Sequence, residues 1–356
     1  MINICKRKKI YKMGSLCQFK RYENDNDILR EEKQETPYDI NKEMNIQNNK
    51  FFDVIEKCKL EEKAEYEKIE NQIDYIYDEK GELRNKKTNE KVGKLDQKEY
   101  EKVGEYVTKY IQYLILKKYN FIPMYVPSNE TSNFYTRIKD IPQCEILTSK
   151  NFSNFEKCIC IIQGTGAVRP GLWARSVCIN NNINLGSIIP YIEKFEKDFS
   201  FVVFNPNENF DIDDKNKIIK EFNIMGQHCL YVYKNIIKKN VNIKNVFFIS
   251  HSMGGNYTIE ILKENEEDLL SGKIKKIAFT ESAHKNLYSK LSEKAQLVLK
   301  QIARDYVSSD KPVGEFLYSS EKSGNGVDCY SSGHNQHEFT SGYAIGAIFQ
   351  FFYEEN

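Results

Sequence analysis

Residues 246–264 read VFFISHSMGGNYTIEILKE. An apolar strand is followed here by a sharp turn that carries Ser252, and then by an amphipathic helix. A turn this tight brings strand and helix close together, so only small residues fit two positions before and two positions after Ser252. Ser250 and Gly254 occupy those positions, which gives the motif S-x-S-x-G. The stretch therefore predicts an elbow that presents a serine nucleophile at the end of a strand.

The pattern around this stretch predicts a mostly parallel sheet with helices on both faces, because apolar strands alternate with helices from about residue 156. The strands are expected at Cys158–Ile162, Phe201–Phe204, Val246–Ile249 and Ile274–Phe279. Helices are expected near 187–198, 215–239, 253–264, 290–304 and 340–353. With the elbow at the carboxyl end of one strand, the fold class is α/β and α/β-hydrolase-like, with a small amino-terminal α+β lead-in.

Three regions are expected along the chain. Residues 1–45 are polar and form a disordered tail, whose basic cluster at Lys6–Lys12 is read either as an import signal or as a solvated terminus. Residues 46–150 form an extension that packs on the main α/β-hydrolase-like domain at 151–356. The extension is expected to contain a hairpin over 72–84, a helix over 97–118 and short strands over 123–126 and 134–136.

Composition narrows the class of protein. Lysine and arginine number 52 against 51 acidic residues, a net charge of +1, which argues against a general nucleic-acid-binding surface. Nine cysteines occur without a C-x-x-C pair, so Cys158 and Cys160 are read as core thiols in a reducing compartment. No bilayer-spanning run, signal-peptide core or metal-ligand spacing is evident. The expectation is a soluble nuclear or cytoplasmic protein that uses no cofactor or metal and does not contact membranes.

The glycine-containing loop over 163–171 is the expected oxyanion-binding element. It follows the first strand of the main domain, where α/β-hydrolases donate one backbone N–H to the oxyanion, and the N–H of Met253 is the expected second donor. The loop residues assigned to this role are Gly164, Thr165 and Gly166. A phosphate-cradling loop is the weaker alternative, because no Lys-Ser/Thr pair and no third glycine in register accompany the glycines.

The candidates for the general base and its acid lie further along the chain. His334 and His337 both lie just before the last helix and are candidates for the base. Glu281 closes the next strand and gives the order Ser, Glu, His, which is the α/β-hydrolase order; Asp310 and Asp328 are alternatives. A carboxylate there would hold the imidazole tautomer and stabilise its charged form.

Three more side chains are assigned to the pocket or to support of the triad: His251, His284 and Arg169. The alternative interpretation of His251 is a packed residue beside the elbow that is turned away from solvent. His284 would line the pocket or support the acid. Arg169 is expected to meet either substrate or an internal carboxylate such as Glu208.

Four sequence motifs are considered as a set: IIQGTGAVRPGLWAR at 161–175, FNPNEN at 204–209, SHSMGG at 250–255 and HEFTS at 337–341. They resemble the domain of Argonaute-binding protein two, which also occurs in cotranscriptional regulators of animals and as an appendage of a fungal histone deacetylase. The hairpin YIYDEKGELR at 75–84 is similar to the family's amino-terminal part. The resemblance covers about residues 65–353.

The resemblance implies an α/β-hydrolase-like fold in a regulatory protein with Argonaute or chromatin-silencing partners. Family members act mainly as binding or regulatory proteins, so membership does not establish catalysis. Ser252 and His337 match the family's elbow serine and histidine, which favours His337 over His334. The chain departs from the family at Gln163, where relatives often have His, and at Glu281, where they often have Asp.

The alternative function is an intracellular serine hydrolase, an esterase or thioesterase acting on a small ester, thioester or acylated protein. Its basis is physical, because nucleophile, acid and base stand in the right order beside a glycine loop. Residues 310–330 show no clear helical or strand periodicity, and a lid over the pocket is the one role considered for them. Proteins of this fold class have many different functions, so the geometry of the site is needed to distinguish the two candidates.

Overall fold

The computed structural model describes residues 63–128, 134–150 and 152–354, and only the backbone of residues 63–66. All described residues belong to one compact unit, Tyr38–Asn356. The tail expected over residues 1–45 and its basic cluster lie outside the described residues. None of the helices in the described part of the chain has the length and apolar content needed to cross a bilayer.

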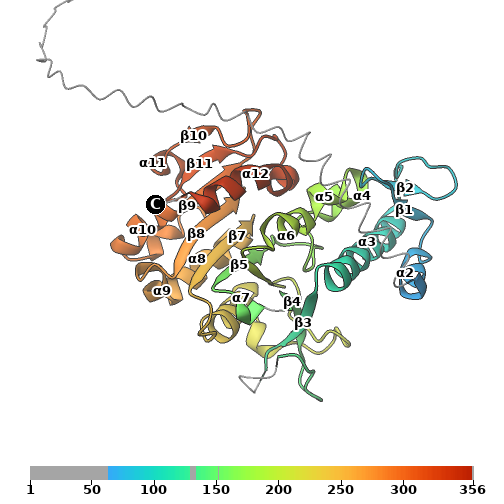
Figure 1. The fold of residues 1–356 in the computed structure, drawn as a ribbon, viewed down its shortest axis with the longest axis horizontal. Helices are drawn as coiled ribbons and strands as arrows, with labels where there is room; N and C mark the ends of the chain where they lie inside the picture. Colours follow the sequence, from blue (N-terminus) through green and yellow to red (C-terminus); the bar gives the residue numbers. More distant parts are fainter. Residues whose placement is uncertain (1–62, 129–133, 151, 355–356) are drawn as a thin grey trace, which may run out of the picture. The chain divides into compact units, whose positions relative to one another are not determined.

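A nine-stranded sheet runs through this unit in the order β10-β11-β9-β8-β7-β5-β6-β4-β3 (Figure 1). The six strands from β11 to β6 are parallel to their neighbours, whereas β10, β4 and β3 pair antiparallel. The strands are β3 (Phe121–Val126), β4 (Cys144–Ser149), β5 (Lys157–Ile162), β6 (Ser200–Val203), β7 (Asn245–His251), β8 (Ile274–Thr280), β9 (Ala303–Val307), β10 (Phe316–Tyr318) and β11 (Asp328–Ser331).

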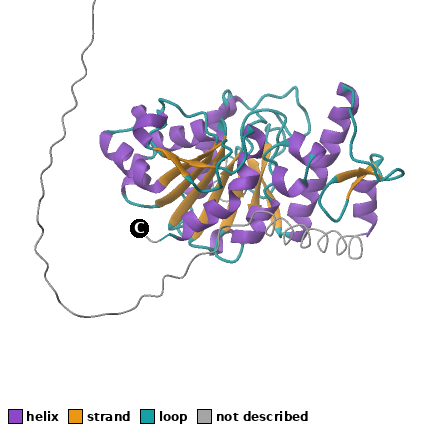
Figure 2. Ribbon diagram, turned by 90° about the horizontal axis from the view of Figure 1, so that it is seen from above, coloured by secondary structure: helices purple, strands orange, loops and turns teal. Residues whose placement is uncertain are grey.

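Helices cover both faces of the sheet (Figure 2). One face packs against α3 (Gln97–Lys118), α4 (Arg175–Asn180), α5 (Ile183–Gly186), α6 (Ile189–Phe195) and α12 (Thr340–Tyr353). The other packs against α7 (Met225–Val232), α8 (Gly254–Glu264), α9 (Glu266–Leu270) and α10 (Glu293–Ile302). The remaining helices are α2 (Lys63–Glu70), α11 (Ser320–Ser323), a π-helix at Tyr233–Ile237 and 3-10 turns at Phe152–Asn154, Lys220–Phe222, Tyr288–Lys290 and His337–Phe339.

Strand β5 shows why both faces are buried. Cys158, Cys160 and Ile162 belong to the core on the α7–α8 side, and Ile159 and Ile161 belong to the core on the α3–α12 side. Side chains of a strand alternate between its two faces, so a continuous apolar run is what a doubly covered parallel strand requires. This architecture, with an elbow between β7 and α8, confirms the predicted α/β-hydrolase-like fold.

The amino-terminal elements are continuous with the main sheet. The predicted helix over 97–118 is confirmed as α3, which begins at a capping box formed by Asp96 and Glu99. The predicted hairpin is confirmed as β1 (Tyr75–Tyr77) paired with β2 (Leu83–Asn85). Strands β3 and β4 join the nine-stranded sheet through β6, so the boundary expected at residue 150 does not separate two sheets.

Two predicted helix boundaries and one predicted strand were wrong. The helix expected over 215–239 begins only at Met225, because Asp211 and Asp214 accept backbone N–H groups and hold the preceding segment in turns. The helix expected to reach residue 304 ends at Ile302, where the chain enters β9 and pairs with β8. The strand expected at 134–136 is absent from the described residues there, and β4 supplies the partner of β3.

Candidate functional site

Ser252 lies at the elbow between β7 and α8, and its backbone has a φ of 53°. This left-handed conformation is uncommon for a residue with a side chain and is held by several hydrogen bonds. The N–H of Ser252 donates to the Thr280 carbonyl at 3.1 Å, and the Ser252 carbonyl accepts from Gly255 and Ala283 at 3.1 Å each. The surroundings therefore impose the turn that presents the serine, which is partly exposed.

The S-x-S-x-G variant of the motif satisfies the steric demand of the turn. A Cβ at Gly254 would stand 2.2 Å from the carbonyl oxygen of Ile162, so no larger residue fits without movement of the backbone. Ser250 is fully buried, and its hydroxyl is 2.7 Å from the hydroxyl of Thr258 in α8. The serine that replaces the usual glycine is thus small enough and has a hydrogen-bond partner.

The glycine loop after β5 lies directly against the elbow. A Cβ at Gly164 would stand 2.9 Å from the Cβ of Ser252 and 3.4 Å from its hydroxyl oxygen. The N–H groups of Gly164 and Met253 have no acceptor among the described residues. Thr165 and Gly166 are exposed beside them. Backbone donors placed beside a serine hydroxyl are the components of an oxyanion hole.

The two candidate bases have different surroundings. The His337 ring is exposed and lies 4.7 Å, centroid to centroid, from the ring of His251. The His334 ring packs on Phe339 and Tyr343 at 4.4 and 4.7 Å, and its Nδ1 accepts the Gln336 N–H at 3.2 Å. Of the two, His337 is the ring placed beside the elbow.

His251 is a packed residue. It is only 4% exposed, its Nδ1 contacts the carbonyl and hydroxyl oxygens of Thr280 at 3.0 and 3.2 Å, and its ring lies between those of Trp173 and His337. Burial, and then the neighbouring His337, lower the pKa of His251 to about 3. A ring that stays neutral and donates inward supports the elbow and does not exchange protons near pH 7.

Ser252, Glu281 and His337 each follow the carboxyl end of a strand in the parallel part of the sheet: β7, β8 and β11. Glu281 adopts a φ of 48°, and its carboxylate accepts the backbone N–H of Ser308. Within the described residues, no hydrogen bond joins Ser252 to His337 or His337 to Glu281. The triad members lie at one edge of the sheet, but they are not linked by hydrogen bonds.

The alternative acids are no better placed. Asp310 is exposed, and Asp328 accepts the backbone N–H of Ser320 at 2.8 Å.

His284 is fully buried, with its Nδ1 2.5 Å from the Ser282 hydroxyl and its Nε2 2.9 Å from the Asn325 carbonyl. Burial lowers the pKa of His284 to about 4.

A buried carboxyl completes this polar cluster beneath the elbow. Asp305 on β9 accepts from the Ser282 N–H at 3.3 Å and from the Asn325 amide at 3.0 Å. Burial raises the pKa of Asp305 to about 7. The cluster holds the segment after Glu281, and its members were not foreseen as a group because they come from the loop after β8, from β9 and from the loop before β11.

A family model described as the Arb2 domain matches residues 66–216 and 209–313, which together are more than half of the chain. The chain belongs to the Arb2 domain family. The resemblance inferred from the four sequence motifs is thereby confirmed.

Several relatives of this Arb2-family chain cover most of its length. A Dictyostelium discoideum protein named cotranscriptional regulator ARB2A homolog is 33% identical over 319 residues, covering 78% of this chain and 77% of its own. The human cotranscriptional regulator ARB2A is 27% identical over 343 residues and 79% of each chain. Among solved structures, naproxen esterase from Bacillus subtilis is similar with a TM-score of 0.39 and 12% identity, over 73% of this chain and 100% of that chain.

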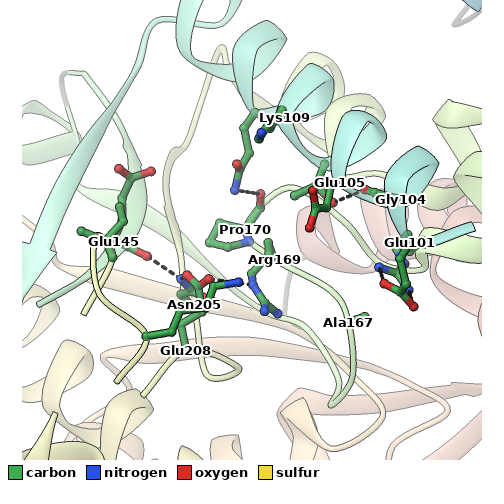
Figure 3. A pocket seen from close by; sticks show the side chains of 15 residues that line it. Glu101, Gly104, Glu105, Lys109, Glu145, Ala167, Arg169, Pro170, Asn205 and Glu208 are labelled. Carbon is green, nitrogen blue, oxygen red and sulfur yellow. Dashed lines mark hydrogen bonds and ion pairs between the residues drawn. The ribbon is translucent and has the colours of Figure 1, made fainter. Parts of the chain in front are cut away.

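The Arb2-family chain also has a pocket that the triad does not line. It measures about 480 Å³ and lies between α3 and the loops that follow β5 and β6 (Figure 3). The expectation that Arg169 meets an internal carboxylate is confirmed here, since its Nε donates to Glu208 at 2.8 Å. Among the described residues, the pocket lining does not include Ser252, Glu281 or His337.

His228, which has no evident role in the sequence, anchors one wall of this pocket. Its Nε2 accepts the backbone N–H of Asn205 at 3.0 Å, and its Nδ1 is 3.6 Å from the Cys144 sulfur. Burial lowers the pKa of His228 to about 3, so the ring is neutral and carries its proton on Nδ1. No described set of three or more His, Cys, Asp or Glu side chains is arranged to hold a metal ion.

Proposed function

We propose that this protein is a regulatory binding protein of the cotranscriptional regulator type, built on an α/β-hydrolase-like scaffold. One observation carries the proposal: the Glu281 carboxylate is hydrogen-bonded to the backbone of Ser308, and His337 is exposed beside the elbow without a bond to Ser252. A triad needs the acid to orient the base and the base to reach the serine. The names of the relatives support the same role.

The proposed partners are Argonaute or chromatin-silencing proteins, and the proposed place of action is the nucleus. The test is co-purification of Argonaute and chromatin proteins with the tagged full chain, beside a Ser252→Ala variant. A regulatory role predicts equal recovery by both forms, because the serine hydroxyl is not needed for binding. Failure of both forms to recover either class of partner would contradict the proposal.

A serine hydrolase remains the second candidate because of the elbow itself. Ser252 is held in a left-handed conformation, with the N–H groups of Gly164 and Met253 beside it. A movement of His337 toward Ser252 would supply a base, since catalytic hydrogen bonds often tighten only with substrate bound.

Labelling of the purified chain with a fluorophosphonate probe separates the two candidates. The regulatory proposal predicts no labelling above that of Ser252→Ala. Rapid labelling that maps to Ser252 and is lost in His337→Ala would favour the hydrolase, with an expected loss of about three orders of magnitude in turnover when the serine is removed.

A further inference from the structure

The pocket beside Arg169 contains hydrogen-bond acceptors that lack donors. Its size, about 480 Å³, falls in the range of small-ligand sites. Asn205, Glu145 and Glu208 line it from the loop after β6 and from β4. Figure 3 shows these side chains on one side of the pocket, with Lys109 of α3 across from them.

Asn205 provides the clearest evidence of a missing partner. It is 1% exposed, and its amide nitrogen donates to the Glu145 carbonyl at 2.8 Å and to the Glu208 carboxylate at 2.5 Å. Both contacts are with acceptors, so the orientation of the amide is determined by its surroundings. Its Oδ1 is buried and has no hydrogen-bond partner among the described residues. An unsatisfied buried acceptor is costly unless a ligand or water supplies a donor.

Glu145 adds a half-buried carboxyl group that has no cationic partner among the described residues. Within the described residues its carboxylate makes no hydrogen bond and no ion pair. Burial, and then the nearby Glu208, raise the pKa of Glu145 to about 7. The charged form is therefore disfavoured in the empty pocket, and a bound cation would favour it.

Arg169 limits the charge that the pocket can accept. Its pairing with Glu208 neutralises one of the two carboxylates, and the adjacent pair Arg175 and Glu101 is closed by contacts of 2.8 and 3.0 Å. The Glu145 carboxyl group and the neutral amide oxygen of Asn205 remain at the inner side. This matches a singly charged N–H donor better than a divalent metal ion, which needs several anionic ligands.

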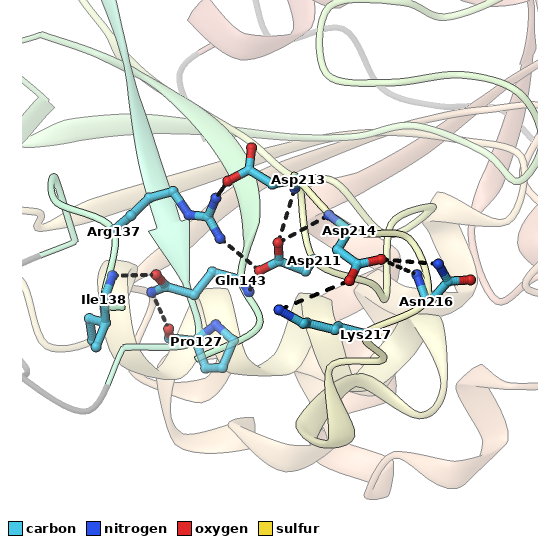
Figure 4. A network of polar contacts seen from close by, with 9 residues as sticks. All are labelled: Pro127, Arg137, Ile138, Gln143, Asp211, Asp213, Asp214, Asn216 and Lys217. Carbon is cyan, nitrogen blue, oxygen red and sulfur yellow. Dashed lines mark hydrogen bonds and ion pairs between the residues drawn. The ribbon is translucent and has the colours of Figure 1, made fainter. Parts of the chain in front are cut away.

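The wall that carries Ile212 and Lys215 is held in place by a separate network. Asp211 accepts from the Gln143 N–H at 2.9 Å and from Arg137 at 2.7 Å, and its other oxygen accepts the Asp213 N–H (Figure 4). Asp211 is 4% exposed, and its contacts anchor this turn to the segment that precedes β4. A pocket with one fixed wall is preorganised for a ligand.

We propose that the pocket lined by Glu145, Asn205 and Glu208 binds an alkylammonium group, supplied either by a free polyamine or by a lysine side chain. The ammonium donates to the unpaired Glu145 carboxylate and to Asn205 Oδ1, while Arg169 keeps Glu208 engaged. The site is distinct from the elbow and does not depend on the proposed regulatory role. Lys109 and Lys215 also line the pocket, and they carry the same charge as the ligand.

Isothermal titration calorimetry of the full chain with spermidine and with N-acetyl-lysine N-methylamide tests the site. Glu145→Gln preserves shape and removes the charge, and it should weaken binding about tenfold or more at pH 7.5. Glu105→Gln is the matched control, because Glu105 lines the same pocket but is exposed on α3; it should change binding less than about twofold. Binding should also weaken at pH 6, where Glu145 becomes protonated.

The two ligands distinguish the source of the ammonium. Tighter binding of spermidine assigns the site to a free polyamine, and tighter binding of the lysine analogue assigns it to a protein side chain. Hexane-1,6-diol, a neutral chain ending in hydroxyl groups, should not bind. Equal affinity of wild type and Glu145→Gln, no binding of either amine, or calcium binding that Glu145→Gln abolishes would each overturn the proposal. Ser252→Ala should bind the amines normally, whichever function the elbow serves.

Discussion

At the scale of single residues, the elbow and the pocket differ in what they require of a side chain. Gly254 must be small because strand and helix meet there, and Ser250 must be small and hydrogen-bonded. Glu145 is instead a polar group that burial disfavours in its charged form. The first two residues support the turn, and the third is a cost to folding that a ligand would offset.

The steric demand at the elbow gives the first prediction. Gly254→Ala places a Cβ 2.2 Å from the Ile162 carbonyl oxygen, so the backbone of β5 or α8 must shift. We expect a loss of about 3 kcal/mol in the free energy of unfolding, measured by urea denaturation. Gly93→Ala is the control, since its Cβ would meet no described atom within 4 Å. Equal stability of the two variants would contradict the steric explanation.

The second prediction concerns Glu145 and pH. Its pKa is about 7 in the folded protein, above the ordinary value of 4.5, so the unfolded chain loses this proton first as pH rises. The free energy of unfolding therefore decreases between about pH 4.5 and pH 7 because of this group, and this loss of stability is complete above about pH 7. Glu145→Gln should be more stable than wild type by roughly 2–3 kcal/mol at pH 8 and nearly equal at pH 4.5. A gain of the same size at both pH values would exclude ionisation as its cause.

At the scale of elements, α3 joins the amino-terminal region to the main sheet. Its buried stripe belongs to the same core as β5, β7 and α12, although α3 precedes β5 by about 40 residues. The capping box at Asp96 and Glu99 sets where this helix begins, and basic residues at Lys117 and Lys118 favour its end. The helix also forms one side of the pocket, so its start affects the position of Lys109 and Glu105.

The capping box gives a prediction at this scale. Asp96→Ala removes the acceptor of the Glu99 N–H, which lies at 2.8 Å, and should cost about 1 kcal/mol of stability in urea denaturation. Lys98→Ala is a suitable control, because Lys98 is exposed in the same turn. A change below a few tenths of a kcal/mol in Asp96→Ala would mean that tertiary packing alone determines the start of α3.

At the scale of the whole molecule, the doubly covered sheet determines which groups solvent can reach. All six cysteines of the described residues are free and buried: Cys144, Cys158, Cys160, Cys178, Cys229 and Cys329. Burial is the largest cause that raises the pKa of Cys144, Cys160, Cys178, Cys229 and Cys329. Thiols react as thiolates, so these groups should be inert in the folded protein.

The reactivity of these six cysteines can be measured in the intact chain. Iodoacetamide at pH 7.5 should leave the peptides of these six cysteines unmodified for hours, and the same peptides should be modified in 6 M urea, as read by mass spectrometry. Cysteines outside the described residues are mapped on separate peptides and do not affect the result. Rapid native modification of any of the six would show that its core opens more readily than the packing indicates.

The sequence alone determined the features that depend on short-range pattern. The apolar run before Ser252, the small residues around it and the helical spacing of α3 each follow from residues within one or two turns of one another. The continuous apolar strands predicted a covered parallel sheet, and the four sequence motifs predicted the family. Helix and strand boundaries at Met225 and Ala303 were missed, because a turn anchored by Asp211 and pairing with β8 outweigh local propensity.

Only the tertiary structure decided how the polar side chains are partnered. Chain order places Ser252, Glu281 and His337 at one edge of the sheet, but side-chain direction there depends on neighbours distant in sequence, such as Ser308 for Glu281. The same holds for Asn205 and Glu145, which meet across 60 residues, and for His228, whose ring holds Asn205. A periodic pattern specifies which face of an element is buried. It does not specify which acceptor a given donor will meet, because that contact is made only when separate elements pack together.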